Sequence, residues 1–272
     1  MLTDITIGQY FPGNSLLHRM DPRMKLVTTL LFMAMVFIPR NWVALAAVGV
    51  FLAAAVACSR LPAKLLWRSV RPILFIVVFT AVLNMFYVTG GRPLLDAGFI
   101  HITTRGVNTA AFIAVRIVCL IAGSSLLTYT TTPTALTDAI EYLLRPLSLL
   151  RLTVHELAMM MTIALRFIPT LMEETDKIMS AQKARGADLE SGGLLQRVRA
   201  LVPILIPLFV SSFRRAYDLA MAMECRCYHG GKGRTRMKQL RTAPRAWVVL
   251  GVYAVVIAGL FLLNRTLGSV LK

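Results

Sequence analysis

Long apolar runs constrain this chain more than any other feature of its sequence. A helix needs roughly 20 apolar residues to cross a bilayer. Three runs approach that length, a fourth exceeds it but contains Arg116, and a fifth is shorter and is followed by Pro39. With 57% hydrophobic and 16% charged residues, the composition is that of a membrane protein. The sequence predicts an all-α, polytopic membrane protein with about five spans, near residues 26–38, 42–58, 72–88, 106–130 and 246–263.

The positions of the basic residues predict which side of the membrane each loop occupies. Lys and Arg are abundant before the first run and in the loop over residues 59–71, and they are sparse in the loops of the opposite side. Because basic loops stay in the cytoplasm, we expect the N-terminus inside and the chain back inside at residue 131. The N-terminal stretch lacks the order of a cleaved signal peptide, so we expect it to remain attached.

Charge and cysteine content narrow the expected partners. The net charge is +17, but the basic residues of the membrane half flank apolar runs, where anionic lipid headgroups would meet them. We therefore expect the lipid bilayer, and no nucleic acid, as a partner. Two of the four cysteines, Cys58 and Cys119, lie in apolar runs, which gives no disulfide framework.

A long insert separates the fourth and fifth runs. Residues 131–244 hold 16 Lys and Arg and ten of the chain's 13 acidic residues, so we expect a large helical cytoplasmic domain there. The predicted organisation is spans one to four over 1–130, this domain over 131–244, and the last span with its tail over 245–272. Thr132 as N-cap and Pro133 at the first helical position open the first helix. The domain's helices are expected near 133–145, 153–187 (with Pro169 as a kink) and 194–229.

The third of these helices has an apolar centre, residues 201–213. This stretch has thirteen residues and contains Pro203 and Pro207. It is too short for a span, so we expect it to lie along the membrane or against other helices.

The second and third helices of the insert end alike. Ala184, Arg185 and Gly186 stand at the tip of the second helix, and Cys225, Arg226 and Cys227 stand at the tip of the third. One arginine at a helix C-terminus is explained by the helix dipole and the last free carbonyl groups. Two matching tips in one insert favour a shared role, and both alternatives stay open at this point.

The sequence contains no convincing motif for metal binding or catalysis. Cys225 and Cys227, two positions apart, would point in roughly opposite directions unless the helix had already ended, and no further ligand pair stands beside His229 to complete four ligands. The segment "GGKGRT" at 230–235 lacks the first glycine and the Ser or Thr of a phosphate loop. We expect no metal, no cofactor and no catalytic residue. Arg116 should face protein or water, and we favour a structural bond to helix carbonyls or to Asn84 over a role in a pathway.

Several motifs spread along the chain resemble one known family. They are "LLHRMDPRMKL" (16–26), "TTPTALTDAI" (131–140), "IALRFIPTLMEET" (163–175), "AQKARGAD" (181–188) and "RRAYDLAMAMECRCY" (214–228). The chain resembles the transmembrane T component of energy-coupling factor (ECF) transporters, a family that includes the membrane subunit of bacterial cobalt and nickel importers.

The resemblance implies a function for the insert. In that family the T subunit joins two cytoplasmic ABC-type ATPases to a small membrane subunit that captures a vitamin or metal ion, and each coupling helix ends in an arginine motif that sits in an ATPase groove. The resemblance implies that two motifs dock ATPases: Ala184, Arg185 and Gly186 form the first, and Cys225, Arg226 and Cys227 form the second. The second motif departs from the family's frequent Ala-Arg-Gly, which leaves open whether its thiols are redox-active. The stretch with Leu201, Pro203, Pro207 and Phe213 is a candidate contact with the substrate-binding subunit.

Two rival functions remain. A permease subunit of an ordinary ABC importer would line the translocation path with its own spans, and a membrane-embedded lipid enzyme would turn over substrate by itself. In the resembling family, substrate specificity belongs to a separate subunit. The transported substrate and the number of substrate-binding subunits served are therefore not encoded in this chain.

Overall fold

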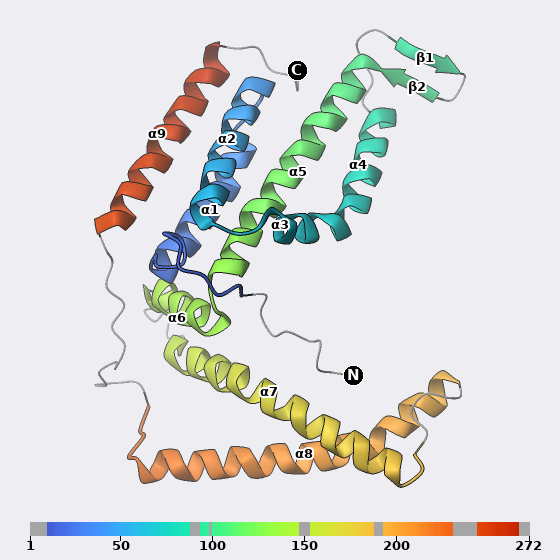
Figure 1. The fold of residues 1–272 in the computed structure, drawn as a ribbon, viewed down its shortest axis with the longest axis vertical. Coiled ribbons are helices and arrows are strands. Elements are labelled where there is room, and N and C mark those ends of the chain that lie inside the picture. Colours follow the sequence, from blue (N-terminus) through green and yellow to red (C-terminus); the bar gives the residue numbers. More distant parts are fainter. Residues whose placement is uncertain are drawn as a thin grey trace. The chain divides into compact units, whose positions relative to one another are not determined.

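The computed structural model describes residues 10–87, 93–97, 100–146, 153–187, 193–230 and 244–266. The described chain is helical apart from one short antiparallel hairpin (Figure 1), which the sequence analysis did not anticipate. The elements are α1 (Pro22–Phe37), α2 (Trp42–Ser59), α3 (Ala63–Val70), the 3-10 turn η1 (Arg71–Ile73), α4 (Leu74–Tyr87), β1 (Pro93–Ala97), β2 (Ile100–Thr103), α5 (Thr104–Thr130), α6 (Pro133–Leu144), α7 (Val154–Ala184), α8 (Leu194–Cys225) and α9 (Pro244–Thr266).

The chain forms two compact units, and the division between them falls within α6. The first, here called the bundle unit, takes residues 9–139 and 240–272, while the second, the paired-helix unit, consists mainly of residues 140–239. The bundle unit holds α1 to α5 and α9; the paired-helix unit holds α7 and α8.

In the bundle unit α5 is the central helix. It contacts α1, α2, α3 and α4, while α9 packs on α1 and α2. The shared core is apolar, and its buried members are Phe32, Met35, Val36, Ala44, Val48, Leu52, Leu61, Cys119, Leu126, Tyr129 and Leu260. All four cysteines of the chain are free thiols.

Short polar side chains cap the start of several helices. Asp21 accepts a hydrogen bond from the Arg23 amide at 3.0 Å and precedes Pro22, the first residue of α1. Asn41 accepts from the Ala44 amide at 2.8 Å at the start of α2. The predicted N-cap Thr132 accepts from the Ala135 amide at 3.3 Å, so the predicted start of α6 is confirmed.

Polar contacts tie the connection between α1 and α2 to the rest of the bundle. Asn264 of α9 donates to the Ile38 carbonyl at 2.8 Å and accepts from the Arg40 amide at 3.1 Å. Arg116 donates from Nη2 to the Pro39 carbonyl at 2.6 Å and lies 4.9 Å from the centre of the Phe112 ring. The expected bond of Arg116 to a carbonyl is thus found, in a loop instead of a helix. The alternative prediction, a bond from Arg116 to Asn84, is wrong: Arg116 bonds to Pro39, and the Asn84 amide donates to the Thr80 carbonyl one turn earlier.

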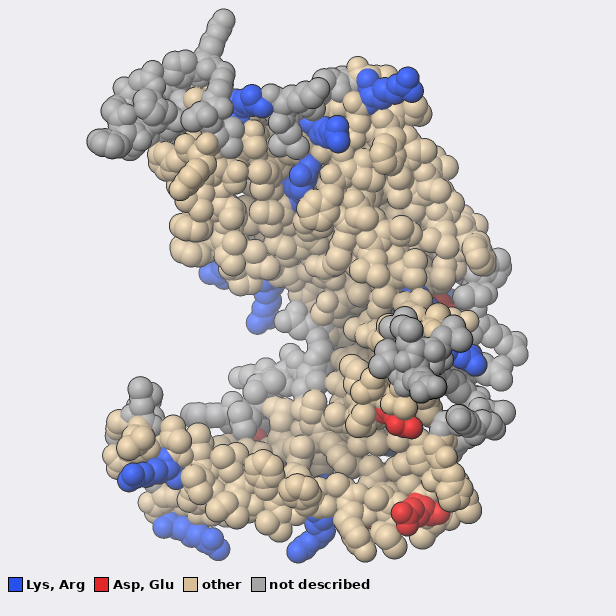
Figure 2. Space-filling view, turned by 180° about the vertical axis from the view of Figure 1, so that it is seen from behind, with Lys and Arg blue, Asp and Glu red and all other residues tan. Residues whose placement is uncertain are grey.

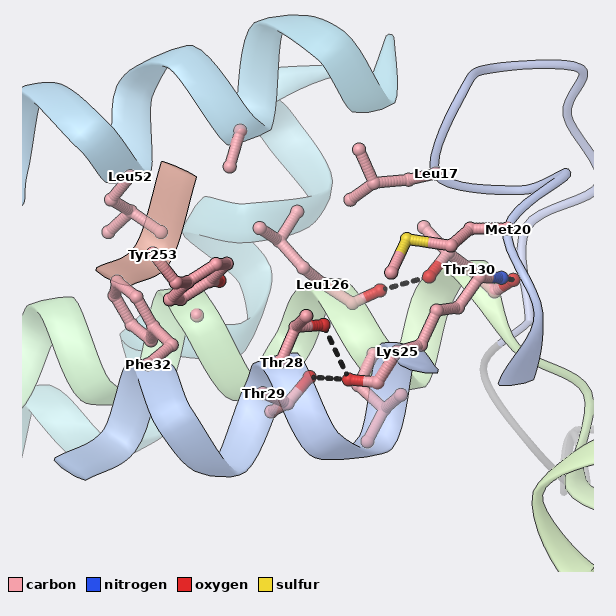
Figure 3. Close-up of a pocket in the computed structure, with 13 residues that line it drawn as sticks. Leu17, Met20, Lys25, Thr28, Thr29, Phe32, Leu52, Leu126, Thr130 and Tyr253 are labelled. Atoms are coloured by element: carbon pink, nitrogen blue, oxygen red, sulfur yellow. Dashed lines mark hydrogen bonds between the residues drawn. The ribbon is translucent and has the colours of Figure 1, made fainter. Parts of the chain in front are cut away.

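A small pocket lies between α1, α2, α5 and α9, with Lys25 among its lining residues (Figure 3). Its volume is about 60 Å³, and apolar side chains line most of it. The Lys25 ammonium is buried and donates to the Thr130 carbonyl at 2.8 Å and to the His18 carbonyl at 3.3 Å. Lys25 therefore satisfies a carbonyl at the C-terminal end of α5, a position that helix geometry leaves without a donor.

Helix length and composition support several membrane crossings. Among the described residues, six helices are long and apolar enough to span a bilayer: α2, α3 with α4, α5, α7, α8 and α9. Four of the five predicted spans are among these six, while α1, with 16 residues, is shorter. The other two candidates, α7 and α8, belong to the insert that the sequence was expected to place in the cytoplasm, and α8 extends the apolar stretch 201–213 to a length that could cross a bilayer. In Figure 2 the visible face of the bundle unit carries basic side chains at its two ends and a wide uncharged band between them, which is the pattern that a bilayer selects.

Candidate functional site

The paired-helix unit is built from two long helices that contain prolines. α7 has 31 residues with Pro169 inside it, and α8 has 32 residues with Pro203 and Pro207 inside it. A proline within a helix removes one backbone hydrogen bond without necessarily ending the helix. The prediction that the second helix of the insert continues through Pro169 is confirmed.

A cluster of three polar side chains joins the two helices. Glu174 of α7 accepts from the Ser211 hydroxyl and, through its other oxygen, from Arg215 at 2.6 Å. Glu174 is the more buried member of the ion pair, with 20% of its side chain exposed against 41% for Arg215. A half-buried, hydrogen-bonded pair of this kind fixes the register of two helices better than an exposed pair does.

A second contact fills a gap that proline creates in α8. The carbonyl of Pro203 would normally accept from the amide four residues later, but that residue is Pro207, which has no N–H. Gln182 of α7 donates to this carbonyl at 3.4 Å. The earlier residue of α7, Glu174, pairs with the later part of α8, and the later residue, Gln182, pairs with the earlier Pro203. The segments around 174–182 and 203–215 are therefore antiparallel.

Both helices end in the same backbone motif. At the end of α7, the Gly186 amide bonds to the Lys183 carbonyl at 3.0 Å, and the Ala187 amide bonds to the Gln182 carbonyl at 3.0 Å. At the end of α8, the corresponding bonds run from the Cys227 amide to Glu224 at 2.8 Å and from the Tyr228 amide to Met223 at 3.0 Å. These paired bonds define a Schellman motif. Arg185 and Arg226 are the C-cap residues in the two motifs.

The residue after each arginine adopts a left-handed conformation. Gly186 has a φ of 85°, and Cys227 has a φ of 55°. Glycine adopts this conformation at no steric cost, whereas a residue with a Cβ is strained there. The two tips therefore share a geometry but differ in how readily their sequences adopt it.

These ends correct the predicted helix boundaries. α7 ends at Ala184, short of the predicted residue 187, and α8 ends at Cys225, short of the predicted residue 229. α6 ends at Leu144 and α7 begins at Val154, each one residue inside the predicted bounds of 145 and 153. The left-handed residues Gly186 and Cys227 terminate the helices because a right-handed helix cannot continue through them.

The predicted motif residues lie on the surface of the tips. Ala184, Arg185, Gly186, Cys225, Arg226 and Cys227 are all exposed. Within the described part of the chain, neither the Arg185 nor the Arg226 guanidinium forms a hydrogen bond or an ion pair. The two tips lie at opposite ends of the paired-helix unit (Figure 1). A partner can therefore approach each arginine separately.

The region of Cys225, Cys227 and His229 offers no assembled metal site. The described residues contain no group of three His, Cys, Asp or Glu side chains positioned to hold a metal ion. α8 ends at Cys225 and Cys227 lies beyond it, so the helix has already ended between the two cysteines and the expected divergence of their side chains along one helix does not apply. Both thiols are exposed.

The apolar centre of α8 is also exposed. Leu201 is 50% exposed, Phe209 61% and Phe213 71%, and both prolines of this stretch are exposed, while Ile204 is buried at 4%. Large apolar side chains exposed along a helix mark a surface for lipid or for another protein. This stretch was predicted from the sequence, whereas the cluster of Glu174, Ser211 and Arg215 was not, since nothing in the local pattern pairs residues of two different helices.

The fold and this unit define a class of protein: a multi-pass helical membrane protein whose two long paired helices present matched arginine tips. A family model described as a cobalt transport protein matches residues 13–237. A Ruminiclostridium cellulolyticum energy-coupling factor transporter transmembrane protein is 51% identical over 97% of this chain and 98% of that protein. The proteins of the same description from Thermosediminibacter oceani and Bacillus subtilis are 52% identical (93% of this chain, 97% of that protein) and 48% identical (97% and 100%).

The chain therefore belongs to the family of energy-coupling factor transporter transmembrane proteins, the T components of ECF transporters. It is a multi-pass cell-membrane protein and a component of a transporter. The resemblance drawn from the sequence motifs is confirmed.

Proposed function

We propose that this chain is the scaffold that couples two cytoplasmic ABC-type ATPases to a small substrate-binding membrane subunit, for the uptake of a vitamin or metal ion. The observation that carries the proposal is the pair of identical helix ends, each of which presents an exposed arginine without a partner inside the described chain. One arginine tip would serve each ATPase.

The chemistry of arginine suits this role. Its planar guanidinium offers several donors in a fixed arrangement, which can bind carboxylate or carbonyl groups of a groove at two points. Buried interface arginines are also among the residues whose loss weakens a complex most. The small residues on either side of each arginine would allow the helix tip to approach a groove closely.

The contacts between α7 and α8 give the coupling a physical form. When the ATPases close on ATP, the grooves and the tips inside them would move. Glu174, Ser211 and Arg215 hold the two helices at one register, so a displacement of one tip would be transmitted to the other helix instead of being absorbed between them.

The test is co-purification of the tagged chain from its native membrane, with mass spectrometry of the proteins retained. We expect two ATPases with the wild type, loss of most ATPase in Arg185→Glu or Arg226→Glu, and complete loss in the double variant. Arg166→Glu on α7 and Arg214→Glu on α8 are matched controls, because both arginines are exposed and stand away from the tips. ATPases that stay bound to the double variant would refute the docking role. Two copies of this chain in each complex would favour an ordinary ABC permease.

The apolar centre of α8 is the proposed contact with the substrate-binding subunit. Leu201, Pro203, Pro207 and Phe213 belong to the exposed stretch described above. Phe209→Ser with Phe213→Ser should release the small membrane subunit and leave the ATPases bound. Trp247→Ser, at an equally exposed apolar position of α9, should release neither. Retention of the small subunit by the double variant would exclude this surface.

The proposed orientation places the tips in the cytoplasm. Cys225 and Cys227 are exposed thiols, so a membrane-impermeant maleimide reports directly on their side of the membrane in a Cys58→Ser background. We expect labelling in inside-out vesicles and none in right-side-out vesicles. The reverse result would overturn the orientation while leaving the fold unchanged.

A further inference from the structure

The helix α3 joins two apolar helices and lies across the end of the bundle where α2 ends (Figure 1). One of its faces is fixed against α5. The Ser69 and Tyr129 hydroxyls lie 2.5 Å apart, and the Tyr129 hydroxyl donates to the Leu65 carbonyl at 3.3 Å. Val70 and Tyr129 are buried, with 6% and 3% exposed. The rotation of α3 about its own axis is therefore set by these contacts.

On the opposite side lies a basic stripe, here defined as Lys64 and Arg68 of α3 together with Arg71, the C-cap residue of α3 and the first residue of η1. Successive helical residues are about 100° apart, which places these three side chains within roughly 60° of one another. All three are exposed. Trp67 stands at the border of the stripe and is 61% exposed. Arg60, immediately before α3, is also exposed and ends α2 in a left-handed conformation.

Within the described residues, the basic stripe has no acidic partner. The sequence contains no Asp or Glu between Asp21 and Asp96. In the described part of the chain, none of the three basic side chains forms an ion pair or a side-chain hydrogen bond. Three neighbouring cations without a counter-charge repel one another, so an anion from outside the chain would stabilise this arrangement.

The surroundings indicate which anion fits. α3 leads through the short turn η1 into α4, whose Phe75 and Phe79 are 78% and 55% exposed on an apolar helix. The basic stripe is therefore continuous with a surface suited to lipid. Tryptophan prefers the interface between headgroups and acyl chains, and a basic amphipathic helix with an aromatic residue lies in that interface.

We propose that α3 is an interfacial helix whose basic stripe binds the phosphate headgroups of anionic phospholipids, with Trp67 inserted at the same level. The proposal does not depend on the transport function. An acidic surface of a partner protein is the competing occupant, and the lipid is favoured because Trp67 and the exposed apolar face of α4 adjoin the stripe.

Trp67 provides the first test. The full chain with Trp42→Phe and Trp247→Phe carries Trp67 as its sole tryptophan and is reconstituted into phosphatidylcholine with increasing amounts of brominated phosphatidylglycerol. We expect the brominated anionic lipid to quench Trp67 at least about threefold more strongly, at equal mole fraction, than brominated phosphatidylcholine does. Lys64→Gln with Arg68→Gln should remove this preference. Equal quenching by the two brominated lipids would overturn the proposal.

Native mass spectrometry gives a second test without tryptophan substitutions. The chain released from mixed micelles should retain phosphatidylglycerol, and Lys64→Gln with Arg68→Gln should reduce the retained lipid. Arg40→Gln with Arg265→Gln is the matched control, since both arginines are exposed at helix ends away from α3, and it should keep the lipid. If the α3 variant retains its lipid but loses a partner protein in co-purification, the stripe is a protein-docking surface and the lipid proposal is wrong.

Discussion

Arg185 and Arg226 occupy the same position in two copies of one backbone motif. Each arginine is the last residue before a left-handed turn, and each turn is closed by the same pair of amide-to-carbonyl hydrogen bonds. The arginines stand 41 residues apart in the chain and on different helices. Their shared geometry leaves both guanidinium groups exposed at a helix end, as the proposed docking role requires.

The left-handed position at each tip predicts opposite effects of substitution. Cys227→Gly should stabilise the end of α8 by about 1 kcal/mol, and Gly186→Ala should destabilise the end of α7 by a similar amount. The measurement is hydrogen exchange at the Tyr228 and Ala187 amides, which close the two turns. Cys227→Ala is the matched control, because it removes the thiol and keeps the strain. If the Tyr228 amide exchanged equally slowly in the Cys227→Gly and Cys227→Ala variants, position 227 would carry no backbone strain.

The ion pair between the helices predicts a defect in coupling. Glu174→Gln removes the carboxylate that holds Ser211 and Arg215. Under the proposed function, this substitution should lower uptake severalfold while the proposed ATPase partners remain bound. The neighbouring Glu173→Gln is the control, because Glu173 is exposed. In a double-mutant cycle, Glu174 and Arg215 should show a coupling energy of about 1 kcal/mol, given the partial exposure of the pair. If Glu174→Gln left uptake unchanged, the contact between α7 and α8 at Glu174 would not be needed for coupling.

Close packing at Gly123 predicts that even a methyl group at this position destabilises the fold. A Cβ at this position would lie 2.1 Å from Cε1 of Phe32, so Gly123→Ala should lower the free energy of unfolding by about 1–3 kcal/mol. Adding Phe32→Leu should recover part of the loss. Gly49→Ala is the control, because nothing lies within 4 Å of its Cβ position. Thermal unfolding in detergent, followed by tryptophan fluorescence, distinguishes the variants; similar midpoints for Gly123→Ala and Gly49→Ala would contradict the packing.

The buried ammonium of Lys25 predicts a structural role at the end of α5. Lys25→Met should destabilise the bundle unit by about 1–3 kcal/mol, because the Thr130 carbonyl then loses its donor in a buried site. Arg19→Met, at an exposed position, should change the unfolding midpoint little. The same thermal assay applies, and a Lys25→Met variant as stable as the wild type would show that this hydrogen bond contributes no net stability.

Local sequence signals determined a large part of this fold. Apolar run length placed α2, α4, α5 and α9, because crossing a bilayer requires a continuous apolar helix whatever its neighbours are. Capping residues such as Thr132 fixed helix starts for the same local reason, and the recurrence of an arginine at two helix ends was visible from the sequence alone. The hairpin of β1 and β2 carried no comparable signal.

Only the tertiary structure decided which distant residues meet. Glu174 finds Ser211 and Arg215 because α7 and α8 pack antiparallel, and Gln182 finds the one carbonyl that Pro207 leaves free. Lys25 reaches Thr130 across more than a hundred residues because α1 packs against α5. Such pairings depend on helix packing, which periodicity and composition do not encode. The exact end of α8 also depended on the tertiary structure. Cys227 adopts a strained left-handed conformation that its residue type does not predict.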